Sequence, residues 1–174
     1  RDRSVSRGLG DVYKRQSQSR DLDLKELCTE EQVFQYADFE WGTDSEQLFK
    51  QSSLKFDEKD LGQGDESSTK TYESKEKFSL ENAESNMDLE FSDGQLSQVS
   101  FTFDIEQDAN TWIQKEVDEL NSLYGGGIAT GLGNQIYQWQ GEQDTVLQLT
   151  TFTEGDESAT VILSVASMEY SIGS

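Results

Sequence analysis

Alternating apolar and polar residues predict a β-hairpin near the middle of the chain. Apolar side chains occupy every second position of two neighbouring runs: Met87, Leu89 and Phe91, then Val99, Phe101 and Phe103. A period of two places the apolar side chains of each run on one face of a sheet. Ser92-Asp93-Gly94 separates the runs and is typical of a tight turn, because glycine adopts positive φ without steric cost. With one apolar and one polar face, the predicted hairpin is antiparallel and half-buried.

A long amphipathic helix is predicted directly after the hairpin. Its apolar residues recur at steps of three and four: Ala109, Ile113, Val117, Leu120 and Tyr124. This spacing is typical of a helix with one apolar stripe, which Trp112 and Leu123 widen. We expect Asp108 to be the N-cap, and the three glycines at 125–127 to end the helix.

A short N-terminal helix is expected after Trp41, because Thr43 and Glu46 form a T-x-x-E capping box. Alternation predicts further strands, at 54–57, 70–73, 135–140, 146–152 and 160–168. Residues 78–83 fit either a strand or a bent connection, and 57–69 and 125–133 are expected to be loops. The predicted fold class is α+β: an antiparallel sheet with the short N-terminal helix and the long amphipathic helix packed on one face.

The first sixteen residues, RDRSVSRGLGDVYKRQ, differ in character from the rest of the chain. They hold five Lys or Arg and two acids, a net charge of +3 in a chain of 174 residues and net charge −21. The run resembles translated sequencing-adapter read-through, and we exclude it from fold reasoning; a native basic tail is the alternative. We interpret residues 1–31 as a non-native or disordered N-terminal segment and residues 32–170 as a single α+β domain.

The negative charge changes the range of expected partners. Thirty-five acidic residues against 14 basic ones would be repelled by nucleic acid and by anionic membrane surfaces. The same charge suits a protein that meets a basic protein partner. No run approaches the roughly 18 apolar residues of a membrane-spanning helix, so no membrane span is expected in this fragment. The oligomeric state stays open.

The residues that most catalytic and metal sites need are scarce. There is no histidine, and Cys28 is the single cysteine, so Ser-His-Asp and Cys-His arrangements and a zinc site are excluded. Residues 104–108 place carboxylates at alternate positions, as at the start of an EF-hand loop. Ala109 then stands where that loop needs glycine, and Lys115 where it needs glutamate. We expect no catalytic residue, no cofactor and no metal ligand, and interpret 104–108 as solvated polar surface, with a weak calcium site left open.

Exposed aromatic side chains are the remaining candidates for a binding surface. Tyr137 and Trp139 lie two residues apart and share one face of a predicted strand. They are our candidate binding residues, and packing against the sheet is the alternative interpretation.

Two segments resemble known bacterial envelope modules. Residues 41–49, WGTDSEQLF, are similar to the helix start of the outer-membrane assembly lipoprotein family (SmpA/OmlA) and of β-lactamase-inhibitor-protein-like repeats. Residues 89–99 are similar to the strand-turn-strand of the same modules. The resemblance implies an extracytoplasmic, non-catalytic protein-binding module, and it transfers no site residues.

The leading interpretation is a non-enzymatic, extracytoplasmic protein-interaction domain of a bacterial envelope or secreted protein. Two alternatives stay open at this point. One is a proteinaceous inhibitor that blocks a secreted enzyme with loop 57–69 or 125–133. The other is a small acid-dependent hydrolase, since the many acidic residues allow many carboxylate pairs.

Overall fold

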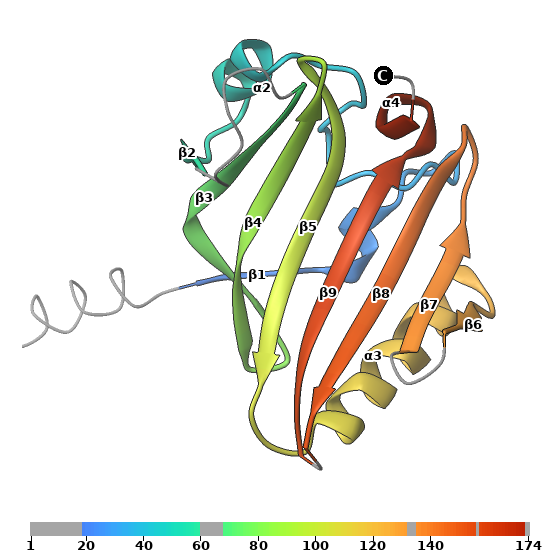
Figure 1. Ribbon diagram of the computed structural model, residues 1–174. Helices are drawn as coiled ribbons and strands as arrows, with labels where there is room; N and C mark the ends of the chain where they lie inside the picture. Colours follow the sequence, from blue (N-terminus) through green and yellow to red (C-terminus); the bar gives the residue numbers. More distant parts are fainter. Residues whose placement is uncertain (1–18, 60–67, 132–134, 156, 173–174) are drawn as a thin grey trace, which may run out of the picture.

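A large open β-sheet dominates the computed structural model, which describes residues 19–59, 68–131, 135–155 and 157–172 (Figure 1). The strands of the described residues are β1 (Arg20–Asp21), β2 (Phe56–Glu58), β3 (Thr69–Leu80), β4 (Ala83–Ser92), β5 (Gln95–Ile105), β6 (Ile128–Thr130), β7 (Gln135–Gln140), β8 (Thr145–Glu154) and β9 (Ser158–Ser167). The helices are η1 (Leu24–Leu27, a 3₁₀-helix), α2 (Ser45–Gln51), α3 (Ala109–Tyr124) and α4 (Met168–Ile172). Strand order is β1-β3-β4-β5-β9-β8-β7-β6, with β2 also paired to β3.

The sheet is mixed, so the prediction of an antiparallel sheet was correct only in part. β1 runs parallel to β3, with Arg20 beside Phe78, whereas the other strand pairs are antiparallel. β2 covers the opposite end of the same β3 edge, from Tyr72 to Ser74. The two short strands together satisfy backbone groups that an exposed edge strand would leave unpaired.

The predicted central hairpin is confirmed as β4 and β5. Asp93 and Gly94 form its turn, with φ values of 51° and 81°, as a two-residue hairpin turn requires. The six apolar residues of the two predicted runs are at most 2% exposed: Met87, Leu89, Phe91, Val99, Phe101 and Phe103.

A second hairpin joins β3 to β4 and resolves the ambiguity at residues 78–83. Leu80 pairs with Ala83, and Glu81 and Asn82 between them have φ values of 47° and 68°. The turn therefore has the same left-handed backbone as the central one. The sequence signal was weak because this turn lacks glycine, the residue that adopts such a backbone most readily.

Residues 19–31 belong to the folded domain, which corrects the predicted boundary at residue 32. Leu22, Leu24 and Leu27 are 5%, 2% and 1% exposed and lie in the same core as the sheet. Asp23 caps η1 by accepting a hydrogen bond from the Lys25 amide. Charged residues separate these three leucines in the sequence, so the polar composition of the segment concealed its apolar side.

The start of α2 lies one residue later than the predicted capping box. Asp44 is the N-cap, and its carboxylate accepts a hydrogen bond from the Gln47 amide at 2.8 Å. The Thr43 hydroxyl instead donates to the Glu40 carbonyl. Leu48 is buried, and Phe49 stacks on Phe56 with ring centroids 5.2 Å apart.

Helix α3 begins as predicted, but Asp108 does not cap it with its side chain. Asp108 has left-handed backbone geometry (φ 52°) and makes no side-chain cap hydrogen bond. The Ala109 amide donates to the Glu157 carbonyl, so the turn between β8 and β9 satisfies one of the free backbone donors at this helix terminus. The helix buries one side, at Ala109, Ile113, Glu116, Val117 and Leu120.

The other strands differ from prediction mainly at their ends. The predicted strand 160–168 stops at Ser167, because Met168 begins α4 and is 41% exposed. The predicted loop 125–133 contains β6. The predicted loop 57–69 is shorter than expected, because residues 57–58 belong to β2 and Thr69 begins β3. Residues 60–67 and 132–133 of these two predicted loops lie outside the described residues.

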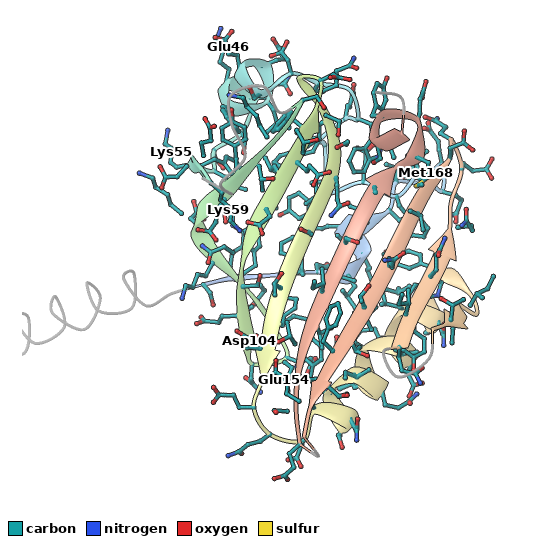
Figure 2. All side chains as sticks on the ribbon, viewed as in Figure 1. Glu46, Lys55, Lys59, Asp104, Glu154 and Met168 are labelled. Carbon is teal, nitrogen blue, oxygen red and sulfur yellow. The ribbon has the colours of Figure 1, made fainter. Side chains whose placement is uncertain are left out.

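The two faces of the sheet have different surroundings. Behind the sheet as Figure 1 shows it, η1 and α3 pack on the apolar side chains and form one core with residues of the 33–54 segment. The centre of the face turned toward the viewer has no helix over it (Figure 1). Figure 2 shows the side chains of this face along β3, β4, β5, β9 and β8.

Candidate functional site

The open face of the sheet is lined by rows of polar side chains that the strand register brings together. Residues directly paired across antiparallel strands point to the same face. One row crosses the sheet through six strands: Glu73, Asp88, Ser100, Ser164, Gln148 and Gln138. These residues alternate with the buried ones in each strand, so the row lies opposite the core. All six are half-buried.

The middle of this face is uncharged. The neighbouring rows add amide, hydroxyl and aliphatic side chains on β5, β9, β8 and β7: Gln98, Ala166, Val146 and Gln140, then Thr102, Ile162, Thr150 and Ile136. On these strands the acidic residues of the face lie at the lower end, where Figure 2 labels Asp104 and Glu154. In a chain with 35 acidic residues, this is a large neutral area able to donate and accept hydrogen bonds.

Acidic residues form the margin of the face on β3 and β4. We call Glu73, Asp88 and Glu90 the acidic margin. Lys59 reaches over this margin, with its Nζ 3.3 Å from Asp88 Oδ2 and 3.9 Å from Glu73 Oε2. The Lys59 amide also donates to the Thr71 carbonyl, which fixes the residue beside β3.

The carboxyl groups of the margin are partly withdrawn from water. Asp88 Oδ1 is buried and has no hydrogen-bond partner among the described residues. Burial raises the pKa of Asp88, and Glu73 adds to this effect, while Lys59 opposes it. Burial also raises the pKa of Glu90. A basic group from another molecule would relieve these carboxylates, because a nearby cation favours the ionised form.

Trp139 is in the core, which corrects its prediction as a binding residue. It is 2% exposed, and its indole Nε1 donates to the Gly125 carbonyl at 2.9 Å and to Asn121 Oδ1 at 3.1 Å. Tyr137 lies on the same inward side of β7 and is half-buried against the core. Both residues therefore face away from the open face of the sheet.

The other candidate residues from the sequence lie apart from the open face centre. Asp104 accepts a hydrogen bond from the Thr160 hydroxyl at 3.1 Å, and Asp108 lies at the turn into α3. Within the described residues, no group of three or more His, Cys, Asp or Glu side chains is arranged to hold a metal ion. Cys28 is half-buried, and burial raises the pKa of its thiol.

Sequence reasoning did not find the acidic margin as a site. Asp88 and Glu90 lie between the apolar residues of a predicted strand, but the approach of Lys59 to Asp88 depends on the β2–β3 and β3–β4 registers. Lys59 also falls within the predicted loop 57–69. The sequence signal for this site was the alternation of polar residues. Alternation assigns those residues to the polar face of a strand, but it does not show which strand and which side chains lie next to them.

Comparisons with known proteins identify no relative of this chain: no protein-family model, curated protein or solved structure matches it.

None of the helices in the described part of the chain combines the length and the apolar character needed to cross a membrane.

Proposed function

We propose that the chain is a non-enzymatic protein-interaction domain that binds a basic protein partner through the open face of its sheet. The observation that carries this proposal is the combination of a broad uncharged polar area with the acidic margin beside it. Protein interfaces depend on polar groups that find partners, while complementary charge at the rim guides association. The net charge of −21 favours encounter with a basic surface.

We place this domain in the cell envelope or outside the cell of a bacterium. The support is the resemblance of residues 41–49 and 89–99 to small envelope modules with a protein-binding role. For the fold, we propose the α+β arrangement of such modules, in which α3 acts as the amphipathic helix packed on the inner face. The open face is then left for the partner.

A charge-reversal experiment tests the proposed surface. The double variant Glu73→Lys with Glu90→Lys changes the acidic margin, and Asp118→Lys with Glu119→Lys makes the same change in charge on the exposed side of α3, away from the open face. Each purified chain is immobilised and exposed to the basic proteins of a bacterial envelope extract. We expect a saturable partner that the wild type and the α3 double variant retain equally, and that the margin variant binds about tenfold less (about 1.4 kcal/mol).

Salt dependence and folding controls make the result interpretable. Binding should weaken as salt rises from about 50 to 300 mM, because exposed charges are screened over a shorter distance. Circular dichroism and thermal melting establish that both double variants remain folded. Equal retention by both variants would assign binding to another surface, and a complete lack of saturable retention would refute the interaction function.

A further inference from the structure

A second candidate site lies at the upper end of the sheet on its inner side. It is a pocket of about 400 Å³ between α4, the β7–β8 turn and the N-terminal segment. Figure 1 shows α4 at the upper end of β9, above the blue N-terminal segment. Val33, Trp41, Ser167 and Tyr170 are among the lining residues.

Two aromatic side chains of this pocket, Trp41 and Tyr170, are held in place by contacts with neighbouring backbone. The Trp41 indole Nε1 donates to the Phe34 carbonyl at 2.8 Å. Tyr170 packs directly on the Gly42 backbone, since a Cβ there would lie 2.6 Å from its ring. Gly42 also has φ of 86°, so glycine suits this position on both grounds.

Helix α4 is itself anchored to the sheet. The Met168 amide donates to the Asp144 carbonyl at 2.9 Å. The Ser171 hydroxyl donates to the Ser97 carbonyl at 3.2 Å. The Tyr170 side chain is therefore presented to the pocket from a fixed backbone.

The charge of the pocket is entirely negative. Glu31, Glu40 and Glu169 line it, whereas Lys and Arg do not. None of these three carboxylates takes part in an ion pair among the described residues. The pocket thus combines aromatic rings with unneutralised carboxylates, the two groups that attract an organic cation.

Ser167 provides an independent polar group inside the pocket. Its side chain is 98% buried (2% exposed) and belongs to the lining. Its hydroxyl makes no hydrogen bond to the described residues and is not fully enclosed, since the fully buried side-chain atoms without a partner are those of Asp88 and Glu116. A hydroxyl oxygen can accept a hydrogen bond from an ammonium N–H.

We propose that this pocket binds an alkylammonium group. The carboxylates of Glu31, Glu40 and Glu169 balance its charge, the Trp41 and Tyr170 rings contact its methylene groups, and Ser167 accepts one N–H. Two sources carry this group: a free polyamine such as spermidine, and the lysine side chain of a protein. Three carboxylates match the several charges of a polyamine. This pocket lies on the opposite side of the sheet from the proposed interaction face.

Isothermal titration of the full chain with spermidine at about 150 mM salt tests the proposal, because screening at that salt suppresses diffuse attraction to an acidic protein. Glu40→Gln with Glu169→Gln removes two charges from the pocket. Glu46→Gln with Glu119→Gln removes two charges elsewhere, and Glu119 lines another acidic hollow that could compete for the ligand. We expect one saturable site whose affinity falls about tenfold in the pocket variant and stays within twofold of wild type in the control.

Further probes separate the sources and the chemistry. A short lysine peptide with blocked ends replaces spermidine in a second titration. If the peptide binds and spermidine does not, and if Glu40→Gln with Glu169→Gln weakens the peptide about tenfold, the occupant is a protein lysine. Tetramethylammonium, which has no N–H, should bind more weakly than either probe. The proposal is overturned by equal losses in the two double variants, or by the absence of a saturable site for both probes.

Discussion

At the scale of single residues, Glu116 is the least expected feature of the molecule. It lies on the inner side of α3, is 0% exposed, and neither of its carboxyl oxygens has a hydrogen-bond partner among the described residues. Burial raises its pKa from 4.5 to about 7, Glu81 and Glu119 add to this rise, and Lys115 opposes it. A buried charge without a partner is costly, so folding favours the protonated carboxyl.

Glu116 should therefore make stability depend on pH. Below about pH 4.5, Glu116 is protonated in both the folded and the unfolded chain, and it costs the protein no stability. As pH rises through about 7, the free energy of unfolding falls by at most about 3 kcal/mol, because the unfolded chain ionises Glu116 more readily than the folded one. Glu116→Gln removes this titration, so the variant should gain stability over the wild type at pH 8 but not at pH 4.5. Urea unfolding at both pH values measures the difference.

The control for this prediction is Glu119→Gln, an exposed acid on the same helix. Glu119 adds to the raised pKa of Glu116, so its removal should lower that pKa and weaken the pH dependence only in part, whereas Glu116→Gln should abolish it. If Glu116→Gln keeps the wild-type difference in unfolding free energy between the two pH values, then Glu116 does not carry the effect.

At the scale of elements, the N-termini of α2 and α3 show that capping by a side chain depends on the backbone geometry of the N-cap residue. Asp44 has an extended backbone and caps α2, whereas Asp108 has a left-handed backbone and does not cap α3 with its side chain. Both residues are good N-caps by type. The difference follows from the backbone of the N-cap residue, because a capping side chain reaches the first helical amides from the extended conformation that Asp44 has and Asp108 lacks.

A pair of single substitutions tests the position of the α2 cap. Asp44→Ala removes the hydrogen bond to the Gln47 amide and should destabilise the protein by about 1 kcal/mol. Thr43→Ala loses only an exposed hydrogen bond to the Glu40 carbonyl and should cost less. Chemical denaturation of the two variants gives the comparison, and a larger loss for Thr43→Ala would favour the T-x-x-E box over the observed cap.

At the scale of the whole molecule, the N-terminal segment completes the core. β1 covers one end of the β3 edge, and η1 places Leu24 and Leu27 behind the sheet. Tyr124 on α3 donates its hydroxyl to the Leu24 carbonyl at 2.5 Å, which ties this segment to the helix. The domain therefore includes residues that composition alone marks as a polar lead-in.

Truncation of a buried leucine tests this integration. Leu27→Ala should lower the free energy of unfolding by about 2–5 kcal/mol, because it leaves a cavity in a packed core. Lys25→Ala, on the exposed side of the same turn, should change it by less than about 0.5 kcal/mol. If both variants change the free energy of unfolding by equally small amounts in thermal and urea unfolding, the N-terminal segment is not part of the cooperative domain.

The spacing of apolar residues along the chain predicted which side chains of a strand or helix are buried. The alternation around Met87 and Val99 predicted which side chains β4 and β5 bury, and Asp93-Gly94 predicted their turn. The three- and four-residue spacing after Asp108 predicted the residues that α3 buries, apart from Glu116. Periodicity reports a side chain's direction, and direction decides burial once a core exists on one side.

The sequence by itself determined the main hairpin, the position of the long helix and the negative charge, because each follows from residue type and spacing along the chain. Only the tertiary structure decided that β1 runs parallel to β3, that Trp139 lies in the core and that Lys59 meets Asp88. The same holds for the pocket that Trp41 and Tyr170, far apart in the sequence, line together. These features depend on contacts between distant residues, whose partners are selected by the packing of the whole sheet and not by local propensity.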